Sequence, residues 1–190
     1  MKSTIVVLIA ASALHAGMAA AADYPERPIR FVVPYPPGGA TDIISRSLAQ
    51  KMSDLLHHQV VIDNRGGGGQ IIGSEIVARA PADGYTILHA TPSFALNTIV
   101  FKKLAYDLHR DFTPITNIAQ GFGYLMLVHP SVQANNVKEL IALAASKPGG
   151  QTFASTGLGG ITHLATELFM NMTKIQMVHV PYKSTGAAMV

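Results

Sequence analysis

Apolar residues along the chain form short β-rich runs that alternate with longer helical stripes. The run IRFVV at residues 29–33 is rich in β-forming residues and stops at Pro34, so it predicts a strand. The next segment has apolar residues three and four positions apart, which predicts a helix with one apolar face. These apolar positions are Ile44, Leu48, Met52 and Leu55. Thr41 and Asp42 stand at the start of this helix and are predicted to cap it.

The alternation of strand and helix continues through the first half of the chain. The expected elements are, in order, a strand at 60–62, a short helix at about 71–79, a strand at 85–90 and a helix at about 93–101. Strands and helices that alternate at such short intervals favour a parallel sheet covered by helices.

A second set of elements is predicted after residue 119. It consists of a strand at 124–130, a helix at about 137–146, a strand at 152–155, a helix at about 161–172 and a strand at 177–182. The helix that starts near residue 161 has an apolar stripe, formed by Ile161, Leu164, Leu168, Phe169 and Met172. The closing segment STGAAMV predicts the start of a further helix, so we expect the 190 residues to be part of a longer protein.

The first 22 residues have the pattern of a secretory signal peptide. Lys2 supplies a basic start, residues 5–14 are apolar but too few to span a bilayer, and Ala20 and Ala22 match an A-x-A cleavage site. We therefore expect cleavage near Ala22 and a periplasmic mature protein that starts at Asp23; the alternative is an uncleaved N-terminal helix or membrane anchor. No later apolar run is long enough for a transmembrane helix, so the mature chain is expected to be soluble.

Composition narrows the class of function. The sequence has a formal net charge of +3 and its basic residues are scattered, which argues against a nucleic-acid partner. It contains no cysteine, which excludes thiolate catalysis, disulfides and cysteine metal sites. Its histidines form no H-E-x-x-H motif and no i, i+4 pair with one another, so we expect neither a metal site nor a cofactor.

Two segments share the order strand, glycine-rich turn and helix start, at residues 34–42 and 155–162. A helix start presents unpaired N–H groups and the positive end of the helix dipole, and glycine lets the backbone approach a ligand closely. In α/β sheets such loops lie at the carboxyl ends of strands, where ligands bind. Two of them in successive units predict an anion held between them, with ordinary turn glycines as the alternative for either loop. A third glycine run, at 66–69, matches neither nucleotide-binding pattern.

A hydrolytic site has weaker support. His163 and Glu167 are four residues apart on a predicted helix, and we expect them to form a packing or hydrogen-bonding pair rather than a catalytic one. The sequence has no G-x-S-x-G nucleophile motif. We therefore expect no enzyme, and a periplasmic hydrolase that uses His163 and a serine is kept as an alternative.

Five stretches of the sequence occur in an order that resembles a known family. They are YPERPIRFVVPYPPGGATD (24–42), VVIDNRGGGGQIIG (60–73), PADGYTILHA (81–90), STGLGGITHLATELF (155–169) and VPYKSTGAA (180–188). Over nearly all of its mature length the chain resembles the Bug-type solute-binding proteins of tripartite tricarboxylate transport systems. The resemblance implies an α/β fold of the periplasmic-binding-protein-like type II class, with two lobes of parallel-rich sheets that close on a small carboxylate. Lobe 1 would comprise residues 23–119 and lobe 2 residues 120–190, and the fold would be incomplete at the C-terminus because family members are much longer.

The resemblance also implies which residues contact the ligand. In lobe 1 they are Tyr35, Gly38, Gly39, Ala40 and Asp42, with Thr91 after the third strand as a further candidate. In lobe 2 they are Ser155, Thr156, Gly159, Gly160 and Thr162. Family members commonly have a serine where this chain has Gly160, so a hydroxyl contact at that position is expected to be missing or replaced by backbone.

The function that this resemblance implies is capture of a small organic acid for the membrane permease subunits of a tripartite transporter. The protein is expected to act as a monomer, without a cofactor or catalytic residues. Two alternatives of other classes remain: a periplasmic ligand-sensing partner of a membrane sensor kinase, and a non-functional truncated fragment.

Overall fold

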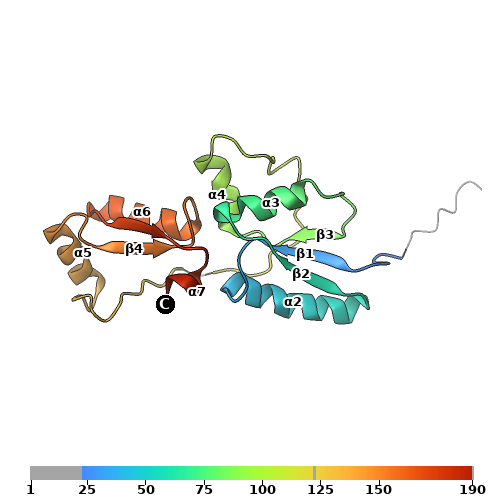
Figure 1. Cartoon of the computed structure of the whole chain (residues 1–190), viewed down its shortest axis with the longest axis horizontal. Helices are drawn as coiled ribbons and strands as arrows, with labels where there is room; N and C mark the ends of the chain where they lie inside the picture. The colour runs from blue at the N-terminus through green and yellow to red at the C-terminus, as the bar shows by residue number, and fades with distance from the viewer. Residues whose placement is uncertain (1–22, 122, 190) are drawn as a thin grey trace, which may run out of the picture.

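Two parallel sheets organise the part of the chain that the computed structural model describes, residues 23–121 and 123–189 (Figure 1). The first sheet has the order β2-β1-β3, with strands β1 (Ile29–Val33), β2 (Val60–Asn64) and β3 (Thr86–Leu88). The central strand β1 pairs in parallel with both neighbours, with Ile29 beside Val60 and Arg30 beside Thr86. The predicted strand at 29–33 and the predicted parallel sheet are therefore confirmed.

Helices cover both faces of this first sheet. Helix α2 (Ala40–Leu56) lies on one side, and α3 (Ile71–Ala78) and α4 (Pro92–Val100) lie on the other (Figure 1). A short 3₁₀ turn, η1 (Gly68–Gln70), leads into α3. The buried core under α2 consists of Ile29, Phe31, Ala49 and Val60. The three helices that the sequence predicts in this half are thus present.

The buried face of α2 differs from the predicted apolar stripe. Leu48 and Met52 pack against the core, but Ile44 and Leu55 are 40% and 79% exposed. Ser45 is fully buried in their place. Its hydroxyl donates to the backbone oxygen of Thr41 at 2.7 Å and lies 2.6 Å from Nδ1 of His89, so burial leaves it paired. Hydropathy alone cannot predict that a hydrogen-bonded polar residue such as Ser45 lies on the buried face of α2.

The predicted cap of α2 is also corrected. The helix begins at Ala40 with Gly39 as its N-cap residue, so Thr41 and Asp42 lie inside the first turn. Asp42 reaches back from this turn and accepts a hydrogen bond from the Gly38 N–H at 2.9 Å. The carboxylate therefore satisfies a donor outside the helix from a position that the dipole also favours.

The second sheet is a parallel pair, β4 (Thr152–Ser155) and β5 (Val178–Pro181). Helices α5 (Val137–Ser146), α6 (Ile161–Thr173) and α7 (Thr185–Ala188) belong to the same unit. Its buried core is formed by Ala144, Met170 and Ile175, with Phe153 and Phe169 among the residues packed against it. These elements were all predicted. The predicted apolar stripe of α6 is partly wrong, because Leu168 and Met172 are 60% and 73% exposed, whereas Met170 is buried.

The predicted strand at 124–130 is wrong for the described residues. Residues 123–129 have no regular secondary structure, and all five side chains from residue 124 to residue 128 are at least 45% exposed. A strand requires a neighbour for its backbone N–H and C=O groups, and in residues 23–121 and 123–189 no strand pairs with this segment. The segment is apolar, as the prediction assumed, but an apolar composition does not provide the neighbouring strand that a β-strand needs.

In the residues that the structure describes, no helix is both long and apolar enough to cross a membrane. The predicted signal peptide, residues 1–22, lies outside the described residues. The lobe boundaries at 23–119 and 120–190 remain predictions, with the first sheet before residue 119 and the second after it.

Candidate anion-binding site

The first loop joins β1 to α2 and presents free backbone N–H groups. Gly38 has a φ of 86°, a conformation that favours glycine, and a Cβ atom built on Gly38 or Gly39 meets nothing within 4 Å. Both glycines therefore face open space. Within residues 23–121 and 123–189, no acceptor pairs with the N–H groups of Gly39, Ala40 or Thr41. These groups form the positive end of the α2 dipole, which favours an anion.

Asp42 orders this loop from inside. Its buried carboxylate accepts hydrogen bonds from the Gly38 N–H, from Arg46 Nε and from Asn64 Nδ2, each at 2.9 Å. Burial by itself raises the pKa of Asp42, but the hydrogen bonds from Arg46, Gly38 and Asn64 outweigh it and lower the pKa to about 2. Both oxygens of the ionised carboxylate are bonded within the first unit, which consists of the sheet β2-β1-β3 with helices α2, α3 and α4. A direct contact between Asp42 and a ligand remains a prediction.

Tyr35 and Thr91 come together although 56 positions separate them. The Tyr35 hydroxyl lies 3.2 Å from Thr91 Oγ1. The buried side chain of Gln70 donates to Thr91 Oγ1 through Nε2 and accepts the Thr91 N–H through Oε1 at 3.1 Å. Gln70 has a φ of 84°, so a left-handed backbone is held here by two side-chain bonds. The sequence prediction missed Gln70, although a polar residue that closes a glycine run just before a helix was a usable signal.

The second loop joins β4 to α6 and has internal contacts of its own. Thr162 Oγ1 accepts the Thr156 N–H at 3.1 Å and lies 3.1 Å from Thr156 Oγ1. Ser155 Oγ accepts the Gly157 N–H at 3.1 Å, and Gly160 is the N-cap residue of α6. Three of the predicted hydroxyl residues, Ser155, Thr156 and Thr162, are therefore gathered in this loop.

Two stacked histidines support the second loop. The rings of His163 and His179 are 4.1 Å apart, and Phe153 stacks on His179 at 4.8 Å. Ser155 Oγ lies 2.6 Å from His179 Nε2, and His163 Nδ1 accepts the Gly159 N–H at 3.3 Å. Burial and then the charge of His163 lower the pKa of His179. These contacts agree with the expected packing and hydrogen-bonding role of His163.

The two loops are linked through α4. Among the described residues no hydrogen bond runs directly between the first loop and the second. Instead, Ser93 on α4 accepts the Ile161 N–H at the start of α6 at 2.9 Å. Figure 1 shows α4 beside α6, with the carboxyl ends of β1 and β4 pointing toward each other. Sequence reasoning missed Ser93 because its partner is 68 positions away.

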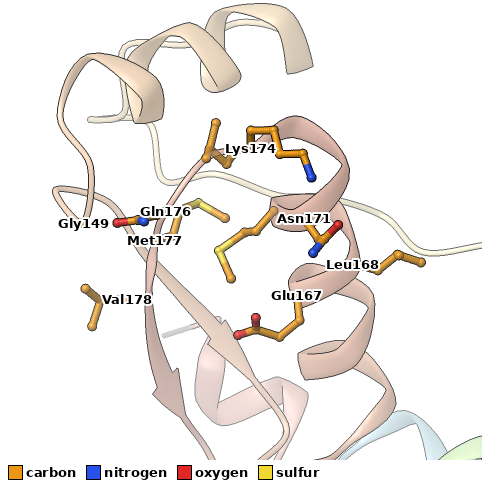
Figure 2. A pocket seen from close by; sticks show the side chains of 10 residues that line it. Gly149, Glu167, Leu168, Asn171, Lys174, Gln176, Met177 and Val178 are labelled. Atoms are coloured by element: carbon orange, nitrogen blue, oxygen red, sulfur yellow. The ribbon is translucent and has the colours of Figure 1, made fainter.

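A separate pocket lies beside α6 and β5, with a volume of about 880 Å³. Figure 2 shows its lining side chains, among them Glu167, Asn171 and Lys174. None of the predicted ligand residues lines this pocket. It touches the second loop indirectly, since Glu167 Oε1 lies 3.5 Å from Nε2 of His163.

The geometry of two helix-start loops in two α/β units fits the class of solute-binding proteins, and comparison with known proteins gives the family. Residues 44–190 match the tripartite tricarboxylate transporter family receptor, and the chain belongs to this family. It is 39% identical over 165 residues to the UPF0065 protein in the tcbD-tcbE intergenic region of Pseudomonas sp. (strain P51), covering 87% of this chain and 49% of that protein. It is 37% identical over 180 residues to protein BugT of Bordetella pertussis, covering 92% and 55%. The chain thus spans about half the length of these relatives.

Solved structures agree with this membership. The periplasmic binding protein BugD is 34% identical with a TM-score of 0.76, covering 87% of this chain and 55% of that one. Rpa4515 of R. palustris, solved with adipate, is 34% identical with a TM-score of 0.78, covering 87% and 56%. MatC of Rhodopseudomonas palustris, solved with bound malate, is 25% identical with a TM-score of 0.76, covering 87% and 56%. The expected periplasmic-binding-protein fold is therefore confirmed. The family consists of solute-binding proteins and not of enzymes, as expected.

Proposed function

We propose that this protein binds a small carboxylate between its two helix-start loops and delivers it to the membrane permease subunits of a tripartite transporter. The observation that carries the proposal is the set of N–H groups at Gly39, Ala40 and Thr41, which have no acceptor among the described residues and lie beside glycines that face open space. Adipate and malate in two related structures support a carboxylate as the ligand class. The protein would act in the periplasm as a monomer, after cleavage near Ala22.

The proposed site consists of the residues expected from the sequence. The structure suggests that some of them contact the ligand directly and that others hold the two loops in place. Backbone N–H groups of the first loop would bind the carboxylate, and hydroxyls of Thr156 and Thr162 would add contacts from the second loop. Asp42 would act mainly by fixing Gly38, because its own oxygens are already bonded. Ser155 would likewise hold its loop through Gly157 and His179.

Proline substitution tests the backbone donors one at a time. Ala40 is the first residue of α2 and follows an extended Gly39, so Ala40→Pro removes one N–H where proline suits a helix start. Val137→Pro is the matched control, because Val137 is the first residue of α5 and follows an extended Asn136. Loss of one hydrogen bond to a charged group costs about 1.5–3 kcal/mol, which corresponds to roughly a tenfold or larger loss of affinity.

The measurement is calorimetric titration with adipate and with malate, using adipamide as the uncharged comparison. We expect one of the two acids to bind, Ala40→Pro to weaken it about tenfold or more, and Val137→Pro to leave it unchanged. Thermal unfolding gives a parallel readout, because a ligand at about 100 times its Kd stabilises the native state by about 2.7 kcal/mol. Equal affinity of Ala40→Pro and the unaltered chain would remove the first loop from the proposal.

A further inference from the structure

A buried hydroxyl on α4 binds the start of α6. Ser93, on the first turn of α4, is fully buried, and its Oγ accepts the Ile161 N–H at 2.9 Å. Ile161 is the first residue of α6, so its N–H is one of the helix-start donors that have no partner inside the helix. A buried donor without an acceptor costs about 1–3 kcal/mol. Ser93 therefore satisfies a group that the second unit cannot satisfy by itself.

Around this hydrogen bond, two glycines lie close to the opposite unit. A Cβ atom built on Gly69 would lie 3.1 Å from the backbone oxygen of Leu158. One built on Gly159 would lie 2.9 Å from the Phe101 ring at the end of α4. Asn97, one turn after Ser93, donates from Nδ2 to the backbone oxygen of Gly69 at 2.8 Å. The glycines leave no room for side chains, so small changes in the spacing of the two units would break these contacts.

The same helix holds both ends of the candidate site. Thr91, the N-cap residue of α4, is fixed by Gln70 and Tyr35 next to the first loop, and Ser93 follows two residues later. In the described residues no acceptor pairs with the N–H groups of Thr162 and His163, so these remain available in the second loop once Ser93 has taken that of Ile161. The short segment from Thr91 to Ser93 thus contacts both loops, through Tyr35 in the first and Ile161 in the second.

We infer that Ser93 is a positioning residue that fixes the α6 start against α4 and thereby sets the spacing of the two ligand-binding loops. The consequence for ligand affinity rests on the proposed function. The effect on the relative position of the two units does not, and it can be measured without any ligand.

The absence of cysteine makes a distance measurement clean, because two introduced cysteines carry the only spin labels. We would place them at Ser47 on α2 and Met172 on α6, both exposed, and measure the label-to-label distance by pulsed electron paramagnetic resonance. We expect a narrow distribution in the parent and in Ser93→Thr, which retains the hydroxyl, and a broadened or shifted one in Ser93→Ala. The control is Thr98→Ala on the same helix, whose hydroxyl donates only to Ala95 of its own helix, and it should leave the distribution narrow.

A distribution in Ser93→Ala as narrow as in the parent, at the same distance, would overturn the inference. A variant that fails to fold leaves a second measurement on the unaltered chain, the hydrogen exchange of the Ile161 amide. Slow exchange there supports the inference, and exchange as fast as in an exposed loop contradicts it. In titrations with adipate and malate, Ser93→Ala should weaken binding several-fold. If neither acid binds the parent, the proposed function fails while the distance result stands.

Discussion

Replacing Asp42 by asparagine tests how the first loop is held. The substitution keeps the shape of the side chain but removes its charge, and an amide group takes the place of one oxygen. Asp42 accepts three hydrogen bonds, from Gly38, Arg46 and Asn64, and the residue is only 3% exposed. Asparagine would meet the same three donors with one acceptor atom, so at least one donor would lose its partner.

The magnitude follows from the pKa of the carboxyl group. The pKa falls from 3.8 to about 2 in the folded chain, which corresponds to a stabilisation of about 2 kcal/mol at neutral pH. Because the folded pKa is the lower one, this stabilisation is complete above pH 3.8 and is lost as the pH falls through about 2. At pH 3 roughly half of it should remain. The difference in the free energy of unfolding between the parent and Asp42→Asn should therefore fall from about 2 kcal/mol at pH 7 to about 1 kcal/mol at pH 3.

The assay is urea unfolding followed by circular dichroism at both pH values. Asp54→Asn is the matched control, because Asp54 lies exposed on the same helix and accepts only from Gln50 Nε2, at 3.3 Å. It should change the free energy of unfolding by less than about 0.5 kcal/mol. An Asp42→Asn variant as stable as the parent at pH 7 would refute this account of the loop. So would a difference in unfolding free energy between the two proteins that is the same at pH 7 and pH 3.

Two further predictions concern the second unit and the packing of the first sheet. The lowered pKa of His179 means that the unfolded chain takes up a proton more readily, so the free energy of unfolding should decrease as the pH falls below about 6.5. In urea unfolding between pH 7.5 and 5.5, His179→Gln should reduce this dependence of the unfolding free energy on pH. An unchanged pH dependence would contradict the prediction. Gly73→Ala would place a Cβ atom 2.7 Å from the Pro34 side chain and 3.0 Å from the Arg65 backbone oxygen, and it should destabilise the chain by roughly 1–3 kcal/mol. Gly121→Ala meets nothing within 4 Å and should have no effect in the same thermal unfolding.

The positions of most elements could be predicted because their signals are local. The strand at 29–33 is bounded by proline, and the helix at 137–146 begins after Asn136, whose side chain accepts the Glu139 N–H. The two helix-start loops follow from the same kind of signal, glycines between a strand and a periodic apolar segment. Local patterns of this kind fix the backbone, and the free N–H groups of a helix start come with the backbone.

The long-range side-chain pairs around the candidate site could not be predicted in this way. Gln70 meets Thr91, His179 meets Ser155, and Ser93 meets Ile161 over 21, 24 and 68 positions of sequence. Each pair depends on how the elements pack, and no periodicity contains that information.

The buried faces of the helices were mispredicted for a related reason, which also explains why the predicted strand at 124–130 does not form. A hydropathy stripe treats burial as a property of the residue, yet Ser45 is buried because Thr41 and His89 pair with its hydroxyl. In the same way, the apolar segment at 124–128 is no strand because a strand needs a hydrogen-bonded neighbour as well as a favourable composition. In both cases the hydropathy pattern lacks the same information, namely which group forms a hydrogen bond with a given polar group. A hydroxyl that finds its partner is buried against expectation, and a backbone that finds none stays irregular despite its apolar side chains. The same rule explains why the two helix-start loops form where glycines follow a strand: a helix start leaves its N–H donors without an intrahelical partner, and at α6 Ser93 supplies the acceptor for one of them.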